Sequence, residues 1–415
     1  MIQSVKGTKD ILPDSIAQWQ FLENQFRIVS AKYGYREIRT PVFEKTEVFS
    51  RGIGEETDIV NKEMYTFADR NGDLLTLRPE MTAPLVRAVI QNNLLEANPT
   101  LKLWYAGPLL RYERPQKGRM RQFHQYGAEC IGTVNPEADV ELLLLADCLI
   151  KSVGIQEYRL LLNTLGNDNV RLIYKNELIN YLSKFKEELS EESKNRLDKN
   201  PLRVLDSKHP ADAQIIAGAP QILDFLDEES ASHFNFVRGS LDALNIKYEI
   251  TPRLVRGLDY YCHTVFEFQS SALGAQDSFG GGGRYNKLFE ELGGKACPAV
   301  GFAFGIERIL IILEAINKLP QISDTVHVSI INLDVKNFVY AQNIAEQLRA
   351  KGLNVACDLQ RRSMKAQMRE ANRLNVKYAI IIGPDEVEKQ TMILKNMSDA
   401  SQREIGISEI NSLEI

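Results

Sequence analysis

The segment from Trp104 to Glu129, WYAGPLLRYERPQKGRMRQFHQYGAE, constrains the possible folds of this chain more than any other. Two strand-like runs flank a short loop that holds a proline and a glycine, which predicts an antiparallel hairpin. Because side chains alternate between the two faces of a strand, Gln125, Gly127 and Glu129 share one face. That face offers no apolar side chain to a core, so it predicts the lining of a polar cavity.

The loop of this hairpin is rich in cations. The first strand-like run ends in Arg111 and Glu113, and the cations that follow are Arg114, Lys117, Arg119 and Arg121. Guanidinium groups are planar and permanently charged, which suits them to phosphate oxygens. A cation-rich loop above a polar floor therefore predicts a site for a phosphorylated substrate beside a small polar one.

The size and composition of the chain limit its class. With 415 residues it is too long for one ordinary core, which predicts two or three domains. Its net charge of −5 gives no global indication of nucleic-acid binding, so that argument must rest on local basic patches. The sequence has no run of about 20 apolar residues, and we expect no membrane span. The five cysteines are scattered without a CxxC pair, which favours reduced thiols in a cytoplasmic protein over disulfides or a zinc site.

Hydrophobic periodicity and turn residues predict the order of the secondary-structure elements. A strand at 35–43 contains Pro41, which favours an edge or an interface. The residues Arg78-Pro79-Glu80 predict the start of a helix that continues to about residue 95, with the proline in its first turn. The other expected elements are helices at 15–32, 136–153 and 306–316, a hairpin at 64–77, and strands at 248–254, 264–269 and 298–304.

The amino-acid composition and the pattern of predicted elements change twice along the chain. From about 168 to 245 lysine and glutamate become frequent and glycine becomes scarce, which predicts an exposed helical insertion. After a linker at 319–325, strands and helices alternate, which predicts a small α/β domain with a mixed or parallel sheet. Cations of this domain recur at mostly helical spacing, which favours contact with RNA phosphates over a merely solvated face. They are Arg361, Arg362, Lys365, Arg369, Arg373 and Lys377.

Two glycine-containing motifs could carry chemistry. RGLDYY at Arg256–Tyr261 combines a glycine, which permits close backbone approach, with two tyrosines that can form aromatic walls. Its alternative is a turn with two half-buried tyrosines. The run Gly280–Gly283, followed by Arg284 and Tyr285, is neither a P-loop nor a dinucleotide fingerprint. It predicts a flexible turn, or else a floor on which a flat base or a small amino acid lies close to the backbone.

Two expected helix starts also have two interpretations each. Glu80 and Thr82 either cap a helix or capture an ammonium group. Arg308 falls in the first turn of its helix, where the helix dipole disfavours a cation by a few tenths to about 1 kcal/mol. That position indicates an anionic partner, or an ion pair with Glu307 or another surface carboxylate. The histidines read as structural, since His124 has no evident carboxylate partner and no pattern typical of acid–base or metal hydrolysis occurs.

Together these motifs resemble the bacterial class II histidyl-tRNA synthetases over essentially the whole chain. The segment around Pro41 resembles motif 1, Arg111–Glu129 resembles motif 2 and Gly305–Arg308 resembles motif 3, and these three mark the class. RGLDYY and the GGRY at Gly282–Tyr285 are much more specific to the histidine enzymes. Asn286 departs from the family, which usually has an aspartate after GGRY.

The resemblance implies an α+β catalytic domain, with the class II antiparallel sheet flanked by helices, a helical insertion and a C-terminal α/β anticodon-binding domain. It implies a first catalytic part at 1–167, the insertion at 168–246, a second catalytic part at 247–320 and the anticodon-binding domain at 325–415. It further implies activation of L-histidine by ATP with Mg²⁺, and transfer of histidine to tRNA(His). The expected protein is a cytoplasmic homodimer with no zinc and no membrane partner.

The resemblance also assigns roles to residues. Histidine would be bound by Glu80, Met81, Thr82, Arg111, Gln125, Glu129, Arg256, Tyr260 and Tyr261, with Tyr285 in an active-site loop. ATP would be bound by Arg111, Glu113, Arg121, Phe123 and Arg308. Phe123 would stack on adenine, Arg308 would hold the γ-phosphate, and the protein ligands of magnesium stay unassigned. Arg256 and Arg111 would be catalytic, because they would hold the α-phosphate from two sides.

Two other classes of protein resemble such a chain. One is the non-catalytic regulatory subunit of ATP phosphoribosyltransferase in histidine biosynthesis, which typically lacks the anticodon domain and parts of the catalytic set. This chain has Arg111, Arg256 and Arg308, and its C-terminal segment is present. The other is a glycine- or proline-specific class II synthetase, which would carry the three class motifs but lack RGLDYY.

Overall fold

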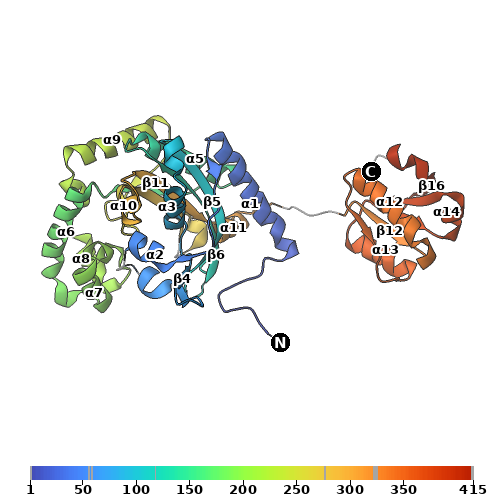
Figure 1. Cartoon of the computed structure of the whole chain (residues 1–415), viewed down its shortest axis with the longest axis horizontal. Helices are drawn as coiled ribbons and strands as arrows, with labels where there is room; N and C mark the ends of the chain where they lie inside the picture. Colours follow the sequence, from blue (N-terminus) through green and yellow to red (C-terminus); the bar gives the residue numbers. More distant parts are fainter. Residues whose placement is uncertain are drawn as a thin grey trace. The chain divides into compact units, whose positions relative to one another are not determined.

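The computed structural model describes residues 2–54, 57, 59–116, 118–274, 277–320 and 326–412. The chain divides into two compact units, Met1–Gln321 and Ile322–Ile415 (Figure 1). Of the expected linker, residues 321–325 lie outside the described residues. Within the described ranges, no helix is long and apolar enough to cross a membrane.

The first unit is built on an eight-stranded sheet with the order β1-β5-β6-β11-β10-β9-β7-β8. The pairs β1–β5 and β7–β8 are parallel and the other pairs are antiparallel. The expected fold class is therefore confirmed. The strands are β1 (Arg36–Glu37), β5 (Leu101–Leu110), β6 (Gln122–Ile131), β7 (Arg159–Thr164), β8 (Glu249–Ile250), β9 (Cys262–Gln269), β10 (Ser278–Tyr285) and β11 (Ala299–Gly305).

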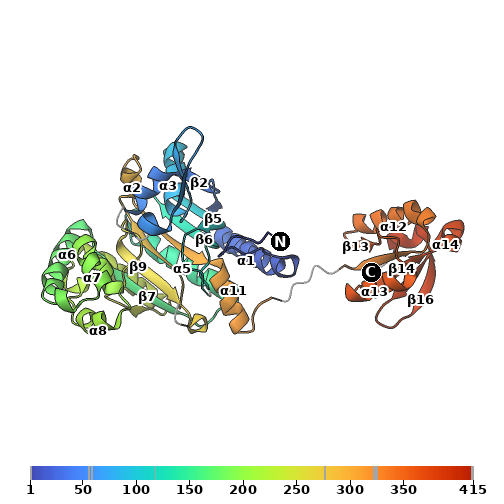
Figure 2. The ribbon, with the colours of Figure 1, turned by 90° about the horizontal axis from the view of Figure 1, so that it is seen from below.

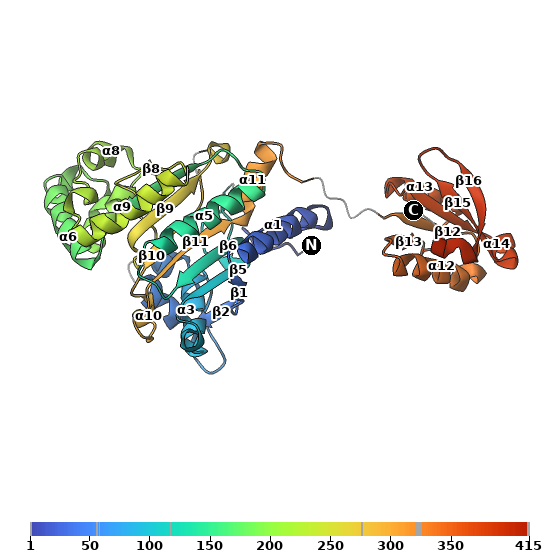
Figure 3. The ribbon, with the colours of Figure 1, turned by 90° about the horizontal axis from the view of Figure 1, so that it is seen from above.

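One face of this sheet is covered by four helices (Figure 3). They are α1 (Pro13–Lys32), α5 (Glu137–Ser152), α9 (Glu228–Ala243) and α11 (Ile306–Ala315). The alternation of side chains places Tyr126, Ala128 and Cys130 of β6 in the core beneath them. The residues that alternate with them, Phe123, Gln125, Gly127, Glu129 and Ile131, consequently face the opposite side of the sheet.

The opposite face is covered only in part. Its elements are α2 (Thr46–Ile53), the π-helical turn η1 (Ile59–Glu63), α3 (Thr82–Gln91), α4 (Leu94–Ala97) and α10 (Leu288–Glu291). A small sheet with the order β2-β4-β3 lies beside α2 and α3, and its strands are β2 (Phe43–Lys45), β3 (Tyr65–Ala68) and β4 (Leu74–Leu77). The hairpin expected at 64–77 is thereby confirmed.

Between β7 and β8 the chain is helical, and α6, α7 and α8 gather beside the β7–β8 end of the sheet (Figure 2). Apolar residues of α6 recur at helical spacing and are buried, among them Tyr174, Leu178 and Leu182. α9 then returns across the face that also carries α5. The elements are α6 (Asp168–Ser183), η2 (Lys186–Glu188), α7 (Glu191–Lys199), η3 (Pro201–Asp206), α8 (Pro210–Ala217) and η4 (Ile222–Phe225).

The second unit is a five-stranded mixed sheet with the order β13-β12-β14-β15-β16. β12 is parallel to β13 and β14, while β15 and β16 are antiparallel to their neighbours. Because alternate residues of β12 enter cores on the two faces, helices cover both of them. The elements are β12 (Val328–Asn332), η6 (Val335–Asn337), α12 (Phe338–Ala350), β13 (Val355–Cys357), α13 (Met364–Arg373), β14 (Tyr378–Ile382), α14 (Pro384–Lys389), β15 (Thr391–Asn396), β16 (Gln402–Gly406) and η7 (Ile407–Ser412).

The strand expected at 35–43, with its interruption at Pro41, is split into β1 at the edge of the large sheet and β2 in the small sheet. Two other local expectations were wrong. The helix expected from Arg78 begins only at Thr82, because the carbonyl of Arg78 accepts from the backbone N–H of Leu110 at 3.0 Å instead of from the N–H of Thr82. It ends at Gln91, since Asn93 adopts a left-handed conformation. The glycine run is no flexible turn but part of β10, paired on both sides.

Candidate active site

The uncovered part of the sheet forms a cavity of about 1030 Å³. Side chains of β5, β6, β9, β10 and β11 form its floor, and the segments at 80–82 and 256–261 form its walls. The expected site residues that line it are Glu80, Met81, Thr82, Arg111, Glu113, Phe123, Gln125, Glu129, Arg256, Tyr260, Tyr261, Tyr285 and Arg308. The fold thus gathers residues from four distant parts of the sequence into one place.

Glu129 lies at the buried end of the cavity and is held by hydroxyl groups. Its Oε1 accepts hydrogen bonds from Thr82 Oγ1 at 2.9 Å and from the Tyr105 hydroxyl at 3.2 Å. Its Oε2 accepts one from the Tyr285 hydroxyl at 2.9 Å. Burial raises the pKa of Glu129 to about 8, and the nearby Glu80 carboxylate acts in the same direction while the hydroxyls oppose the rise. This end is therefore a preformed acceptor for a small polar group.

Glu80 is also buried, and the helix-capping interpretation is confirmed. Its carboxylate oxygens accept from the backbone N–H groups of Thr82 and Ala83, both at 2.8 Å. Burial raises the pKa of Glu80, whereas these two hydrogen bonds and the charge of Arg111 lower it. Each oxygen can accept more than one hydrogen bond, so capping leaves this carboxylate able to bind a ligand as well.

Aromatic side chains enclose the same end. The ring of Tyr260 lies 4.7 Å from that of Tyr261 and 5.5 Å from that of Tyr285, measured between centroids. Both tyrosines of the RGLDYY motif are buried rather than half-buried, and Asp259 and Tyr260 lie in a turn. The Tyr260 hydroxyl is buried and finds no hydrogen-bond partner among the described residues. A buried hydroxyl without a partner costs free energy, which favours a polar ligand beside it.

The other end of the cavity is cationic. Arg111 donates through Nε to the Pro79 carbonyl at 2.8 Å, and its guanidinium lies 5.3 Å from the centroid of the Phe123 ring. Arg256 pairs through Nη1 with the Glu267 carboxylate. Arg308 donates through Nε to the Gly118 carbonyl at 3.1 Å, and the carboxylate of its neighbour Glu307 lies 2.9 Å from His124 Nδ1.

Burial and a neighbouring guanidinium group both act on Arg308. Its pKa is lowered, first by burial and then by the neighbouring guanidinium of Arg119. Arg119 itself pairs with Glu113 at 3.2 Å, at the mouth of the same cavity. Four guanidinium groups, those of Arg111, Arg119, Arg256 and Arg308, therefore line this part of the cavity, together with the carboxylates of Glu113, Glu267, Asp277 and Glu307. Planar guanidinium groups gathered in this way suit the oxygens of a phosphorylated ligand.

Glycines keep the floor between the two ends flat. A side chain on Gly301 would collide with the Glu129 carboxylate, which lies opposite it in the β6–β11 pairing. A Cβ on Gly281 would lie 2.9 Å from the Arg256 guanidinium carbon. The interpretation of the glycine run as a floor close to the backbone is therefore the one that the structure supports.

Arg121 is the one expected site residue that does not line the cavity. Its guanidinium lies 4.1 Å from the centroid of the Tyr112 ring, and its backbone N–H donates to the Gly7 carbonyl at 2.7 Å. Lys117, another cation of the hairpin loop, lies outside the described residues. His124 does have a carboxylate partner, contrary to expectation: its Nδ1 lies 2.9 Å from Glu307 Oε1.

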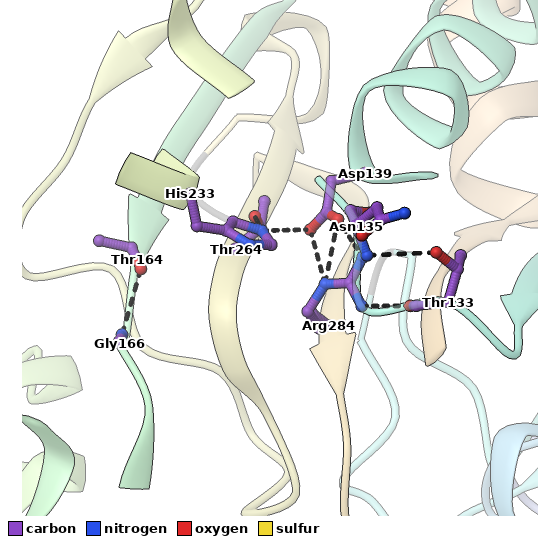
Figure 4. A network of polar contacts seen from close by, with 8 residues as sticks. All are labelled: Thr133, Asn135, Asp139, Thr164, Gly166, His233, Thr264 and Arg284. Atoms are coloured by element: carbon purple, nitrogen blue, oxygen red, sulfur yellow. Dashed lines mark hydrogen bonds and ion pairs between the residues drawn. The ribbon is translucent and has the colours of Figure 1, made fainter. Parts of the chain in front are cut away.

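Behind the floor, a buried network fixes the strand that carries Tyr285 (Figure 4). The fully buried Arg284 pairs with Asp139 of α5 and donates to the carbonyls of Thr133 at 2.8 Å and Asn135 at 2.9 Å. His233 of α9 approaches the same carboxylate at 3.5 Å. Adjacent residues of a strand point to opposite faces, so this anchor holds β10 while Tyr285 reaches into the cavity.

The sequence analysis did not assign Tyr105 or Glu267 to the site, although both line the cavity. Tyr105 lies opposite Gly127 in the β5–β6 pairing, so its ring occupies the space between Gln125 and Glu129. Strict pairing of the predicted hairpin would have found it. Glu267 gave no such indication, because only the order of the strands brings β9 next to the segment that carries Arg256.

Comparison with known proteins gives concordant matches along the chain. Residues 7–309 match the family model for histidyl-tRNA synthetase, and residues 327–413 match the model for an anticodon binding domain. A histidine–tRNA ligase of Chloroherpeton thalassium is 48% identical over 413 residues, 98% of this chain and 96% of that protein. One of Oceanobacillus iheyensis is 45% identical over 412 residues, with shares of 99% and 96%. A crystal structure of apo S. aureus histidyl-tRNA synthetase superimposes with a TM-score of 0.83 at 35% identity, covering 99% of both chains.

Proposed function

The chain belongs to the histidyl-tRNA synthetase family and is an aminoacyl-tRNA ligase, and from this premise we propose how its cavity carries out the reaction. Histidine reacts with ATP to give histidyl-adenylate and pyrophosphate, and histidine is then transferred to the 3′ end of tRNA(His). One observation supports this most directly: a single cavity joins a carboxylate pocket at Glu129 to a cluster of arginines. The alternative of a non-catalytic regulatory subunit has less support, since the relatives match over nearly the whole chain and the arginines are present.

The imidazole of histidine binds in the pocket around Glu129. A ring N–H donates to the Glu129 carboxylate, and the Tyr260 hydroxyl, which lacks a partner among the described residues, bonds to the substrate. Tyr261 and Tyr285 form the walls. A side chain without ring nitrogens would leave these buried polar groups unpaired, and so it would be rejected by several orders of magnitude.

The ammonium group of histidine binds at the start of α3. Glu80, Thr82 and Gln125 supply its acceptors, and Met81 closes the pocket from the same segment. Arg111 lies between this end and the arginine cluster, because its Nε is anchored on the Pro79 carbonyl. Arg111 therefore places the histidine carboxylate against the α-phosphate of ATP.

ATP occupies the cationic end. Phe123 stacks on the adenine, Glu113 contacts the base, and Arg308 holds the γ-phosphate. Arg121 joins them once its guanidinium leaves the Tyr112 ring on which it now rests. Magnesium would be held mostly by the phosphates and water, and it would neutralise part of the charge on the departing pyrophosphate.

The reaction needs positioning and positive charge more than proton transfer. A carboxylate oxygen of histidine attacks the α-phosphorus in line, and the bond to the pyrophosphate oxygen breaks with its electron pair. Negative charge on the phosphoryl oxygens is stabilised by Arg111 from one side and Arg256 from the other. The ion pair with Glu267 holds Arg256 in the cavity before substrates bind.

The tRNA contacts both units of the chain. We assign the catalytic domain to 1–167 and 247–320, the insertion to 168–246 and the anticodon-binding domain to 325–415. The insertion reaches the acceptor stem. In the anticodon-binding domain, Arg362 pairs with Asp358 and Arg373 with Glu370. Within the described ranges the other four cations, Arg361, Lys365, Arg369 and Lys377, have no ion pair, and these four are available to RNA phosphates.

A second copy of the chain covers the small sheet. Phe43 and Phe67 are 53% and 46% exposed, and the strand registers place them on the same face as Leu75 and Leu77. Exposed apolar side chains grouped on one sheet favour a protein partner. We place this homodimer in the cytoplasm, because its five cysteines are free thiols and reduced cysteines are typical of that compartment.

ATP–pyrophosphate exchange with each amino acid in turn tests the assignment. We expect exchange with histidine alone. Exchange driven by glycine or proline would support the other class II synthetases, and no exchange from folded protein would support the regulatory alternative. Either result would refute the proposal.

A further inference from the structure

The segment 256–261, which carries Arg256, Tyr260 and Tyr261, is held from behind by side chains of the helices between β7 and β8. Arg171 of α6 donates through Nη1 to the Tyr261 carbonyl at 2.9 Å and through Nη2 to the Asp259 carbonyl at 3.3 Å. These two hydrogen bonds fix the end of the segment that enters β9.

Two further donors fix the rest of the segment. Asn200, which follows α7, donates through Nδ2 to Asp259 Oδ1 at 2.8 Å. Arg203 of η3 donates through Nη1 to the carbonyl of Arg256 at 3.2 Å. The space between the two sides is only about 20 Å³, enough for roughly one water molecule. The helices therefore contact this segment tightly rather than across a solvent layer.

The segment has little other backbone support. Among the described residues, its one backbone hydrogen bond outside the strands joins the N–H of Asp259 to the Ile53 carbonyl at 3.3 Å. The Asp259 side chain also lies against Gly54, where a Cβ would be 2.8 Å from Oδ2. Most of the polar contacts that position 256–261 thus come from the helices.

The opposite side of the same segment faces the substrates. Arg256, Tyr260 and Tyr261 all line the large cavity. The peptide carbonyl of Tyr261 accepts from Arg171, which does not line the cavity, and that of Arg256 accepts from Arg203, which does. If the backbone at Arg256 or Tyr261 shifts, the side chain of that residue shifts with it. A displacement of about 1 Å at a reacting group can lower a rate by about a hundredfold.

We propose that Arg171, Asn200 and Arg203 are positioning residues for the activation of histidine. They make the helical segment 168–206 part of the machinery for adenylate formation even when no tRNA is bound. This inference rests on the assignment of Arg256, Tyr260 and Tyr261 to the substrates. It extends the role of the helices beyond contact with the acceptor stem.

The test is tRNA-free ATP–pyrophosphate exchange by the full chain. We expect Arg171→Met to lower kcat/KM for histidine by about tenfold to a hundredfold. Asn200→Ala, which removes a single hydrogen bond, should lower it by less. Arg171→Lys should recover only part of the activity, because one ammonium group cannot reproduce the planar, two-pronged guanidinium. Lys186→Met is the matched control, since Lys186 lies in the same helical segment but pairs at the surface with Asp198 at 3.1 Å.

The readouts separate positioning from loss of folding. Misplaced tyrosines raise KM for histidine and a misplaced Arg256 lowers kcat, whereas a smaller folded fraction lowers kcat alone and leaves every KM unchanged. Thermal unfolding identifies a variant that does not fold. If Arg171→Met does not fold, the KM and kcat of Asn200→Ala test the inference in its place. Parental values for both KM and kcat in folded Arg171→Met and Asn200→Ala would overturn the inference. Absence of histidine exchange from the parent protein would instead refute the proposed function.

Discussion

Removal of the Tyr285 hydroxyl should weaken histidine binding and shift its pH dependence. In Tyr285→Phe the buried ring keeps its edge contact with Tyr260, while Glu129 Oε2 loses the hydrogen bond that it accepts at 2.9 Å. A hydrogen bond to a charged group contributes about 1.5–3 kcal/mol. At about 1.4 kcal/mol for each pKa unit, its loss raises the pKa of Glu129 by roughly one to two units above the parent value of about 8.

The sign of the pH effect follows from which form binds. The Glu129 carboxylate accepts the imidazole N–H, so KM for histidine should fall as pH rises through about 8 in the parent protein. In Tyr285→Phe this fall should occur about one to two pH units higher, and KM near pH 7.5 should rise roughly ten- to a hundredfold. KM for ATP should not change, because Tyr285 lies at the other end of the cavity.

Pyrophosphate exchange at varied histidine between pH 6.5 and about 10 measures both effects. Tyr158→Phe is a suitable control, since its hydroxyl donates to Asp147 behind the sheet and does not line the cavity. The reasoning would be refuted by a Tyr285→Phe protein that is folded and has the parental KM for histidine with the same pH midpoint.

Three further perturbations address other parts of the molecule. In single-turnover assays, Arg256→Ala should lower the rate of adenylate formation about 10²- to 10³-fold and change histidine affinity less, because the charge of Arg256 acts mainly as negative charge develops. Arg159→Ala, at an exposed position, is the control. An unchanged rate in Arg256→Ala would exclude the catalytic role. Truncation to residues 1–320 should reduce tRNA charging far more than pyrophosphate exchange, and equal losses would mean that the second unit only stabilises the first. Arg284→Met should lower the free energy of unfolding by about 3–5 kcal/mol in denaturant titrations, because it leaves the buried Asp139 unpaired, whereas Lys287→Met removes only an exposed pair with Asp168 and should change it by under about 1 kcal/mol.

Local pattern was sufficient for the hairpin and for much of the cavity. The alternation along β6 places Tyr126 and Ala128 on one face of the sheet and Gln125 and Glu129 on the other, as observed. The position of Arg308 in the first turn of α11 also follows from its place after a strand that ends in glycine. These features depend on residues close in sequence, where periods of 2 and 3.6 determine which side chains share a face.

Side-chain contacts between residues distant in sequence could not be predicted from periodicity. His124 and Glu307 are 183 residues apart, and the pair forms because β11 lies next to β6 and delivers the first turn of α11 to the end of that strand. Asn286 keeps a buried Oδ1 without a partner among the described residues, and periodicity does not indicate how such an atom is satisfied.

The hairpin at 104–129 thus carries within its own sequence a polar floor, an acceptor at Glu129 and a group of cations. Only the tertiary structure brings Arg256 and Glu267 to face them, and only the packing of α6 and η3 holds the segment that carries Arg256. The physical reason is that residue patterns encode the face of an element, whereas strand order and helix packing depend on the free energy of burying many such faces at once.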